Sequence, residues 1–519
     1  MLTMTKKAKV RNFHQAKWDE PVIFELSNKG ERGILYPEIE KEIEAIVGDG
    51  LSKLPKNMIR KQPPALPELG QMQVLKHYLR MSQHTLGADL NVDIGQGTCT
   101  MKYSPKINET FANSPKLTAL HPSQDESTVQ GILEVIYKLD LFFREISGLD
   151  KFTFQPGGGG QAIFAISSII EAYHRNNGES GKRNEIITTM FSHPSDAAAP
   201  FVKGYKIINI YPNEDGLPDV EALKKAVSEK TAGLLITNPE DTGIFNPMIK
   251  EFTDIIREAG GVSGYDQANA NGILGITRAK EAGFDLSFFN LHKTFSSPHG
   301  CGGPASGALG ATKEFMDYLP VPSVEFDGKK YYFNYDLPKS IGKVRGFYGT
   351  IPAIMKAYSW IMSLGNEGLK EVSRVAVLNN NYLLKKVLEI RGASAPYAKG
   401  RHRIEQVRYS WNKLYEDTGI STEDVTNRMA DFGFHMWSSH HPFIVPQPFT
   451  LEPTESYSKA ELDEYIAGLK QVVKEAYENP EIVKNAPHCS VVHKYDHKPL
   501  DDPARWAITW RAYLKKQKK

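Results

Sequence analysis

The sequence predicts an α/β protein with two folded domains. A large domain carries a mostly parallel sheet covered by helices on both faces, and a smaller α+β domain follows it. Short β-branched runs alternate with helical patterns between residues 131 and 345. Such alternation favours a parallel sheet, because parallel neighbours need a long crossover connection. The strand candidates are EIITTM (185–190), KIINI (206–210), GLLIT (233–237), GVSGYD (261–266) and FDLSFF (284–289).

One crossover helix is clear in the segment IKEFTDIIREAGG, residues 249–261. Ile249, Phe252, Ile255 and Ile256 recur at the spacing that places side chains on one face of a helix. Two glycines, Gly260 and Gly261, then predict its end, because glycine readily adopts the left-handed conformation of a helix terminus. The apolar face of this helix is expected to cover the sheet.

The C-terminal part has a different pattern, with long helical segments around a strand-like stretch near FHMW (434–437). Before residue 130 the chain is rich in proline and lysine and is punctuated by short segments such as QPPALPELG (62–70). We therefore expect an extended N-terminal arm over 1–130, a large cofactor-binding domain over 131–345 and a small C-terminal domain over 346–519. The three long helical patterns cover residues 351–365, 375–390 and 459–478.

Composition excludes several classes of function. The chain has 63 basic and 61 acidic side chains, a net charge of +2, so no overall field favours binding to nucleic acid. Three cysteines in 519 residues make no disulfide framework and suit a reducing compartment. No apolar run is long enough to span a membrane. These features predict a soluble cytoplasmic protein.

The segment KFTFQPGGGGQAIFAISSIIEAYH (151–174) predicts a strand, a glycine-rich turn and then a helix. Backbone N–H groups at such a junction bind anions at the positive end of the helix. Gly157, Gly159 and Ala162 also match a loose dinucleotide pattern. However, no acid follows the next strand to hold a ribose, which disfavours a nicotinamide enzyme.

Two further side chains stand at predicted strand ends. Asp266 ends the strand candidate 261–266, and Lys293 follows the strand candidate 284–289. The carboxyl ends of parallel strands face the ligand crevice of such a sheet. An anion loop, a strand-end aspartate and a strand-end lysine together suit pyridoxal 5'-phosphate. The loop binds the phosphate, the aspartate keeps the pyridine nitrogen protonated, and the lysine forms a Schiff base.

Several longer motifs carry a family resemblance. GQGTCTMKYSPKINE (95–109), GVSGYDQANANGILG (261–275), FDLSFFNLHKTFSSPHGCGGP (284–304) and LEPTES (451–456) resemble glycine decarboxylase, in particular subunit 2 of its two-subunit form. The similarity runs from about residue 18 to residue 492. It implies a fold-type-I pyridoxal-phosphate enzyme that decarboxylates glycine and transfers the aminomethyl group to a lipoyl carrier protein. It also implies a homodimer or a heterotetramer with a subunit 1 homologue.

The resemblance assigns roles to individual residues. Lys293 is the Schiff-base lysine, and Asp266 is the partner of the pyridinium nitrogen. The histidine of the family motif HGTNPA corresponds to His193, which we expect near the ring and count with Lys293 as catalytic. The remaining cofactor-binding residues are Gly159, Gly160 and Gln161 on the phosphate side, Ala268 against the ring, and His292 beside the lysine.

The chain also departs from the family motifs in several loops, and it keeps the cofactor residues. A diverged pyridoxal-phosphate decarboxylase, lyase or aminotransferase acting on another amino acid is therefore the alternative function. A non-catalytic partner subunit is disfavoured, since it would have little reason to keep both Lys293 and Asp266. The departures fall at residues 94–99, 159–163, 193–198, 298–305 and 347–350.

The remaining cysteines and histidines predict no metal site. The tail HCSVVHKYDH (488–497) holds three histidines and a cysteine, but their spacing matches no zinc pattern. Cys301 stands in a turn after Lys293, where we expect a small side chain rather than a reactive thiol.

Overall fold

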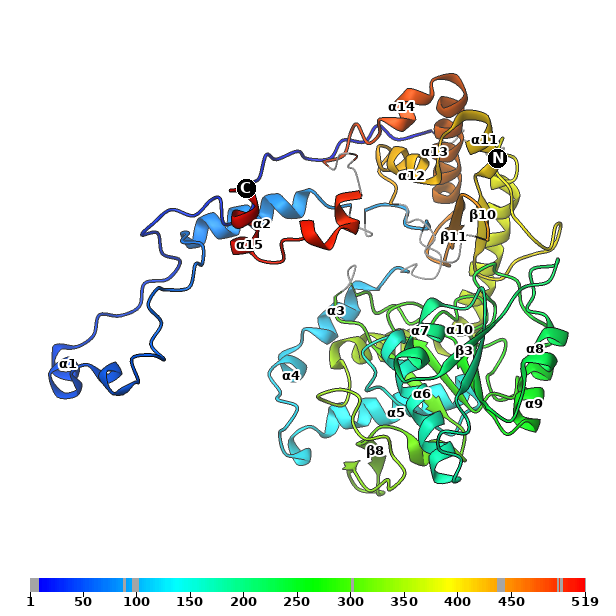
Figure 1. Ribbon diagram of the computed structural model, residues 1–519, viewed down its shortest axis with the longest axis horizontal. Coiled ribbons are helices and arrows are strands. Elements are labelled where there is room, and N and C mark those ends of the chain that lie inside the picture. The colour runs from blue at the N-terminus through cyan, green and yellow to red at the C-terminus, as the bar shows by residue number, and fades with distance from the viewer. Residues whose placement is uncertain are drawn as a thin grey trace. The chain divides into compact units, whose positions relative to one another are not determined.

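The computed structural model describes residues 9–86, 90–95, 102–299, 303–435, 444–491, 494 and 498–518. The chain divides into two compact units (Figure 1). One comprises residues 1–11 and 88–484, and the other comprises residues 12–87 and 485–519. The predicted site residues all belong to the first unit.

The first unit is built on a seven-stranded sheet with the strand order β1-β7-β6-β5-β4-β2-β3. Strands β3, β2, β4, β5 and β6 are parallel to their neighbours, whereas β7 runs antiparallel to both β6 and β1. The predicted parallel sheet is thus confirmed. The strands are β1 (Lys151–Thr153), β2 (Glu185–Thr189), β3 (Lys206–Ile210), β4 (Thr231–Thr237), β5 (Val262–Asp266), β6 (Leu286–Asn290) and β7 (Gly307–Ala311).

Helices cover both faces of this sheet, as predicted. Successive strand residues point to opposite faces, and in β4 they enter two different cores. Leu234 and Ile236 pack with the helices α5, α9 and α10, whereas Leu235 packs with α6. In Figure 1, α6 and α7 lie to one side of β3, and α8 and α9 lie to the other. These helices are α5 (Gln130–Ser147), α6 (Gly159–Asn176), α7 (Pro194–Val202), α8 (Val220–Ala226), α9 (Ile249–Glu258) and α10 (Ile351–Val387).

Helix α10 contains both of the first two C-terminal helical patterns. Its backbone leaves the helical conformation at Gly365, where φ is 61°, so the two patterns meet at a kink. Beyond it, a second core forms around the antiparallel pair of β10 and β11, and Trp411 and Tyr465 are fully buried there. The elements of this region are β10 (Val407–Ser410), α11 (Asn412–Thr418), α12 (Thr422–Ala430), β11 (Pro448–Leu451), α13 (Lys459–Glu478) and α14 (Pro480–Lys484).

The strand expected near residues 434–437 is not seen in Phe434 and His435, and the remainder of that stretch lies outside the described residues. The small sheet is instead formed by β10 and β11, two four-residue strands that pair in register from Val407 opposite Leu451 to Ser410 opposite Pro448. Such short strands show little periodicity of their own, and they form because each pairs with the other.

Shorter elements complete the first unit near its N-terminal part and after β7. Strands β8 and β9 pair as an antiparallel hairpin. The elements are α3 (Lys106–Ala112), α4 (Pro115–Thr118), β8 (Ser323–Phe326) and β9 (Tyr331–Asn334).

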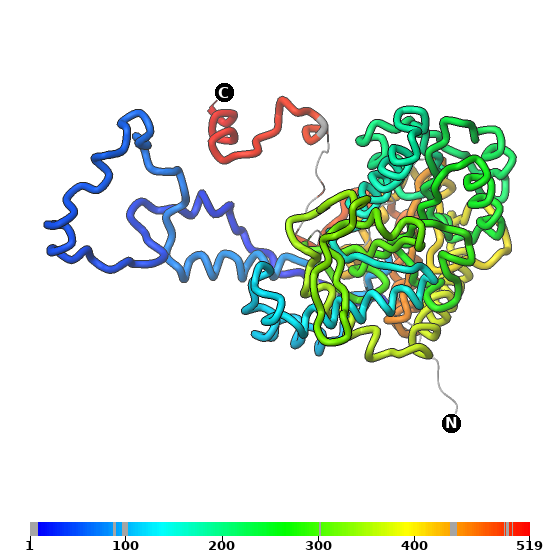
Figure 2. Tube along the Cα trace, turned by 90° about the horizontal axis from the view of Figure 1, so that it is seen from below, coloured from blue at the N-terminus to red at the C-terminus, as the bar shows by residue number. Residues whose placement is uncertain are grey.

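The second unit joins residues from the two ends of the chain. The Gln15 N–H donates to the Cys489 carbonyl at 3.1 Å, and the rings of Phe24 and Trp510 stack at 5.1 Å. Its blue segment before α2 forms a wide open loop in Figure 2, and α1 has no buried residue. The helices of this unit are α1 (Lys41–Val47), α2 (Gln71–Gln83) and α15 (Trp510–Gln517).

Candidate active site

The carboxyl ends of four neighbouring parallel strands meet at one edge of the sheet, and the predicted site residues follow them. His193 lies just after β2, Asp266 is the last residue of β5, and Lys293 follows β6 by three residues. The strand order β6-β5-β4-β2 makes these ends neighbours. Residues far apart in the sequence are therefore gathered at the edge where α/β proteins bind ligands.

Lys293 and Asp266 are both buried, at 6% and 3% exposure, and they lie within electrostatic reach of each other. Burial raises the pKa of Asp266, because desolvation disfavours its charged form. The Ala268 N–H, which donates to Asp266 Oδ1 at 2.8 Å, and the charge of Lys293 act in the opposite direction. The backbone of Lys293 is held by its own turn, where its N–H donates to the Asn290 carbonyl at 3.1 Å.

A second carboxyl group, Asp196, contacts Asp266, and its only sign in the sequence is that it stands in a loop that departs from the family motif. Asp196 lies in the first turn of α7 and is completely buried. Its Oδ2 accepts a hydrogen bond from Thr237 Oγ1 at 3.3 Å, and its carboxyl group lies within hydrogen-bonding reach of that of Asp266. Burial and the charge of Asp266 raise the pKa of Asp196 well above its usual value.

His292 is buried beside Lys293 and is neutral at physiological pH. Burial, together with the nearby charges of Lys293 and His299, lowers its pKa to about 3. Its Nδ1 lies 3.3 Å from the Ser306 carbonyl, so this nitrogen carries the proton and donates, and Nε2 keeps its lone pair. The ring packs edge-on against His299, with centroids 4.8 Å apart.

The glycine-rich turn enters the site at the N-terminus of α6. A Cβ atom built on Gly158 would lie 3.9 Å from His292 Cε1, and one built on Gly159 would lie 3.0 Å from Asn290 Nδ2. Glycine allows this close approach of the loop to the β6 turn. The first N–H groups of a helix have no acceptor inside it. Those at the start of α6, including Gly159, Gly160 and Gln161, are thus suited to an anion.

Both ends of the Gln161 side-chain amide are engaged in hydrogen bonds inside the protein. Its Oε1 accepts from the Gly157 N–H at 2.6 Å, and its Nε2 donates to the Val344 carbonyl at 2.7 Å. The amide therefore fastens the glycine turn to the segment before α10. Its backbone N–H is the group that remains for a ligand.

His193 is the N-cap residue of α7, and it is fixed by Ser195. Its Nδ1 accepts from the Ser195 N–H at 3.1 Å and lies 2.7 Å from Ser195 Oγ. In the neutral tautomer the proton is therefore on Nε2. The backbone of His193 also hydrogen-bonds to the carboxyl group of Asp196, which connects this residue to the site.

Glu452 is a site residue that the sequence reasoning missed, although it lies in the quoted LEPTES motif. Its Oε1 accepts from Asn269 Nδ2 at 2.5 Å and from Asn271 Nδ2 at 2.7 Å. Burial raises its pKa to about 7, while these amides and the charges of Lys293 and Lys102 act in the opposite direction. A titratable acid from the C-terminal region thus lies in the electric field of Lys293.

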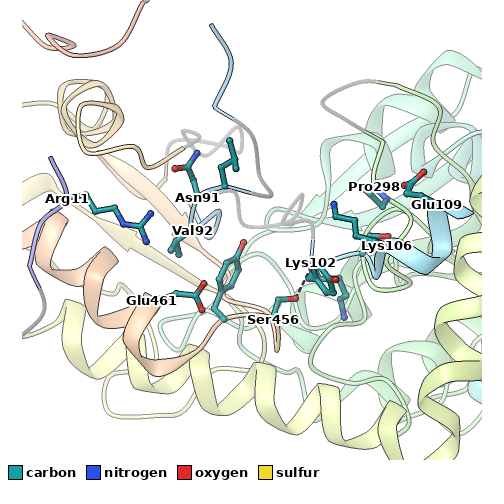
Figure 3. A pocket seen from close by; sticks show the side chains of 13 residues that line it. Arg11, Asn91, Val92, Lys102, Lys106, Glu109, Pro298, Ser456 and Glu461 are labelled. Carbon is teal, nitrogen blue, oxygen red and sulfur yellow. Dashed lines mark hydrogen bonds between the residues drawn. The ribbon is translucent and has the colours of Figure 1, made fainter. Parts of the chain in front are cut away.

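A cavity of about 280 Å³ adjoins the turn that follows Lys293 (Figure 3). Lys102, Lys106 and Pro298 line it on one side, and Ser456 and Glu461 line it on the other. The Tyr103 N–H donates to Ser456 Oγ at 2.9 Å across this space. The segment 102–109 is also joined to the lysine turn, because Ser104 Oγ donates to the Ser296 carbonyl at 3.0 Å.

Some sequence predictions fall outside the described residues, namely those for Cys301, His493 and His497. Among the residues that are described, no group of three or more histidine, cysteine, aspartate or glutamate side chains is arranged to hold a metal. Within the same part of the chain, no helix is both long and apolar enough to cross a membrane.

Family models match two parts of the chain. Residues 156–303, which contain the glycine turn, Asp266 and Lys293, match the class-V aminotransferase model, and residues 372–492 match the model for the C-terminal domain of glycine dehydrogenase. Over nearly its whole length the chain is similar to glycine dehydrogenase (decarboxylating) subunit 2 of several organisms. Identity to the protein of Pyrococcus furiosus is 45% over 515 residues, which covers 98% of this chain and 99% of the relative.

The chain belongs to the glycine dehydrogenase (decarboxylating) subunit 2 family.

Other members of this family are similar to the chain to about the same extent. The relative from Pyrococcus abyssi is 43% identical, with 98% of this chain and 99% of the relative covered, and the one from Caldanaerobacter subterraneus is 41% identical, with 92% and 96% covered. The resemblance seen in the motifs is thereby confirmed. The designation as subunit 2 implies a second kind of subunit as partner.

Solved structures confirm the fold class. The glycine decarboxylase (P-protein) of the glycine cleavage system matches with a TM-score of 0.69 at 20% identity, over 84% of this chain and 99% of that one. A NifS-like protein matches with a TM-score of 0.56 at 15% identity, over 73% and 98%. The fold-type-I architecture and the family together imply pyridoxal phosphate as the cofactor, as the sequence predicted.

Proposed function

We propose that this chain catalyses the decarboxylation of glycine with pyridoxal 5'-phosphate and transfers the remaining aminomethyl group to a lipoyl carrier protein. The single observation that supports it most is the gathering of buried Lys293, buried Asp266 and the start of α6 at one sheet edge. Membership of the glycine dehydrogenase family supports glycine as the substrate over another amino acid.

The side chains at this edge fit the cofactor. Asp266 is an acid in a nearly dry environment, and a protonated ring nitrogen would supply the cation that it needs. Asn290 Oδ1 is buried without a hydrogen-bond donor, which leaves it able to accept one from a ligand. When bound, pyridoxal phosphate supplies an electron sink that stabilises negative charge at the α-carbon of an amino acid.

We assign a role to each protein group in this proposal. Lys293 holds the cofactor covalently, and the N–H groups of Gly159, Gly160 and Gln161 bind its phosphate. Ala268 and His292 would lie beside the ring, and ionised Asp266 would accept a hydrogen bond from the protonated ring nitrogen, which keeps the proton there. His193 donates from Nε2 beside the ring, since its Nδ1 is occupied by Ser195. These roles follow from position and from hydrogen-bonding capacity.

The proposal also covers the assembly of the protein and its location in the cell. We propose assembly as a homodimer or as a heterotetramer with a subunit 1 homologue, with a lipoyl carrier protein as the second substrate. The low cysteine content, three in 519 residues, favours a reducing compartment, so we place the protein in the cytoplasm.

The cofactor assignment is tested by borohydride reduction of the purified protein with pyridoxal phosphate. We expect the cofactor to be fixed to a peptide that contains Lys293. Lys293→Arg keeps the charge but is expected to abolish this labelling and to lower decarboxylation by at least about 100-fold, a typical loss for a missing covalent catalyst. Labelling of another lysine would contradict the assignment. Lys230→Ala, at an exposed position, serves as control.

The substrate is tested by exchange of labelled bicarbonate into the carboxyl group of glycine, with a lipoyl carrier protein and the subunit 1 homologue present. We expect exchange that depends on Lys293. Absence of exchange, together with a change in the absorbance of the bound cofactor on addition of a different amino acid, would favour the diverged enzyme instead.

A further inference from the structure

Asp196 and Asp266 form a pair of carboxyl groups that ordinary charge pairing does not explain. They come from different elements, the first turn of α7 and the end of β5, and they are 0% and 3% exposed. Thr237 connects them. It lies opposite Asp266 in the register of β4 with β5, and its hydroxyl donates to Asp196 Oδ2 at 3.3 Å.

Two buried carboxylates that contact one another cannot both be ionised, because each repels the other where water does not screen them. Among the described residues, Lys293, on the neighbouring strand end, is the cation that acts on Asp266, and the Thr237 hydroxyl and the backbones of His193 and Ala268 are neutral groups that act on the pair. One positive charge balances one carboxylate. The second carboxyl group therefore keeps its proton.

The surroundings decide which of the two holds it. Asp266 has the nearby charge of Lys293 and the Ala268 N–H, both of which favour its ionised form. Asp196 is more deeply buried, and its pKa is raised further by the negative charge of Asp266. The proton thus resides on Asp196, which donates the hydrogen bond that Asp266 accepts.

We infer that Asp196 is a positioning acid: it keeps a proton at neutral pH and through it donates a hydrogen bond to Asp266, which holds Asp266 ionised and correctly oriented for the ring nitrogen of pyridoxal phosphate. The positioning role of Asp196 rests on the proposed function, because it concerns the cofactor. The protonation of Asp196 beside Asp266 does not depend on that proposal. Asp266 is held from one side by the Ala268 N–H and from another by Asp196 before a ligand arrives. Hydrogen bonds from neighbouring groups in this way fix the orientation of a side chain that binds a ligand directly.

The shared proton can be measured in the protein without cofactor. We would record infrared spectra with aspartate isotopically labelled at its side-chain carboxyl carbon, which separates aspartate from the buried glutamates. The wild type is expected to show the carbonyl band of a protonated aspartate at neutral pH, and Asp196→Asn is expected to lose it. Asp219→Asn, at the N-cap of α8, is the control and should leave the band unchanged. A band that persists in Asp196→Asn would overturn the inference.

The positioning role is tested by titration with pyridoxal phosphate. The amide of Asp196→Asn still donates a hydrogen bond, so its affinity should stay within about twofold of wild type, whereas Asp196→Ala should bind about tenfold more weakly, the value of one hydrogen bond to a charged group. Equal weakening in both variants would overturn the role. A wild type that shows the infrared band and binds no pyridoxal phosphate would overturn the proposed function and the positioning role, while the shared proton would stand.

Discussion

Buried acids are the unusual residues of this protein. Several carboxyl groups at or near the carboxyl edge of the sheet are almost inaccessible to solvent, and burial raises the pKa of each. A protein tolerates them because an acid can be buried as its neutral form, or as an ion beside a cation such as Lys293. They are Asp196, Glu240, Asp266, Glu405 and Glu452.

Glu240 provides a test at the residue scale. Burial raises its pKa from 4.5 to about 8, so between these values the folded protein binds a proton that the unfolded chain has released. The free energy of unfolding should therefore fall as pH rises through this window. Glu240→Gln should make that fall shallower, by up to about 1.4 kcal/mol per pH unit, in denaturation of the cofactor-free protein at several pH values.

The control for this prediction is Glu229→Gln, at an exposed position, which should leave the pH dependence unchanged. A slope in Glu240→Gln equal to that of the wild type would show that Glu240 is ionised in the folded protein.

At the scale of elements, the strand, glycine turn and helix over residues 151–176 were predictable, because each part has a strong local signal. The four-glycine turn lies between β1 and α6, as expected. Strand β7 was not predicted, since GALGA has no β-branched residue. It forms because small residues fit under a neighbouring ring: a Cβ on Gly310 would lie 2.2 Å from Phe152 Cζ.

Two adjacent glycines at the start of α6 give a matched pair of variants. A Cβ on Gly159 would lie 3.0 Å from Asn290 Nδ2 and 3.4 Å from Phe288, whereas one on Gly160 has no atom within 4 Å. Gly159→Ala should destabilise the cofactor-free protein by about 1–3 kcal/mol through overpacking. Gly160→Ala should be neutral or stabilising by up to about 1 kcal/mol, because alanine favours a helix.

Thermal and chemical denaturation of the two variants measure this difference. Equal stability of both variants would mean that the β6 turn moves freely, and the close approach of the glycine loop to Asn290 would then not be a constraint.

At the scale of the whole molecule, a buried ion pair joins the C-terminal region to the sheet domain. Arg408 lies on β10, Asp241 lies in the loop after β4, and their side chains are 1% and 4% exposed. Neither partner is remarkable in the sequence, and 167 positions separate them. Removal of one member of a buried ion pair leaves the other charge buried without its counter-ion, which is the costly case.

Arg408→Met should therefore lower the free energy of unfolding by about 3–5 kcal/mol. The surface pair of Arg401 and Asp215, 3.6 Å apart with exposures of 59% and 56%, provides the control. Arg401→Met should cost less than about 1 kcal/mol, because solvent screens that pair. Comparable losses in the two variants, measured by chemical denaturation, would refute the structural role of the Arg408 pair.

The sequence by itself determined the elements with strong local patterns, namely β2 to β6, α6, α9 and α13, and it identified Lys293, Asp266 and the glycine turn as one set. It did so because periodicity, glycines and strand ends are local properties of the chain. The partners of these residues were decided only by the tertiary structure. Asp196, Thr237 and Glu452 reach the site from separate segments, and an isolated acid in a sequence carries no sign of the charge that it will meet when buried.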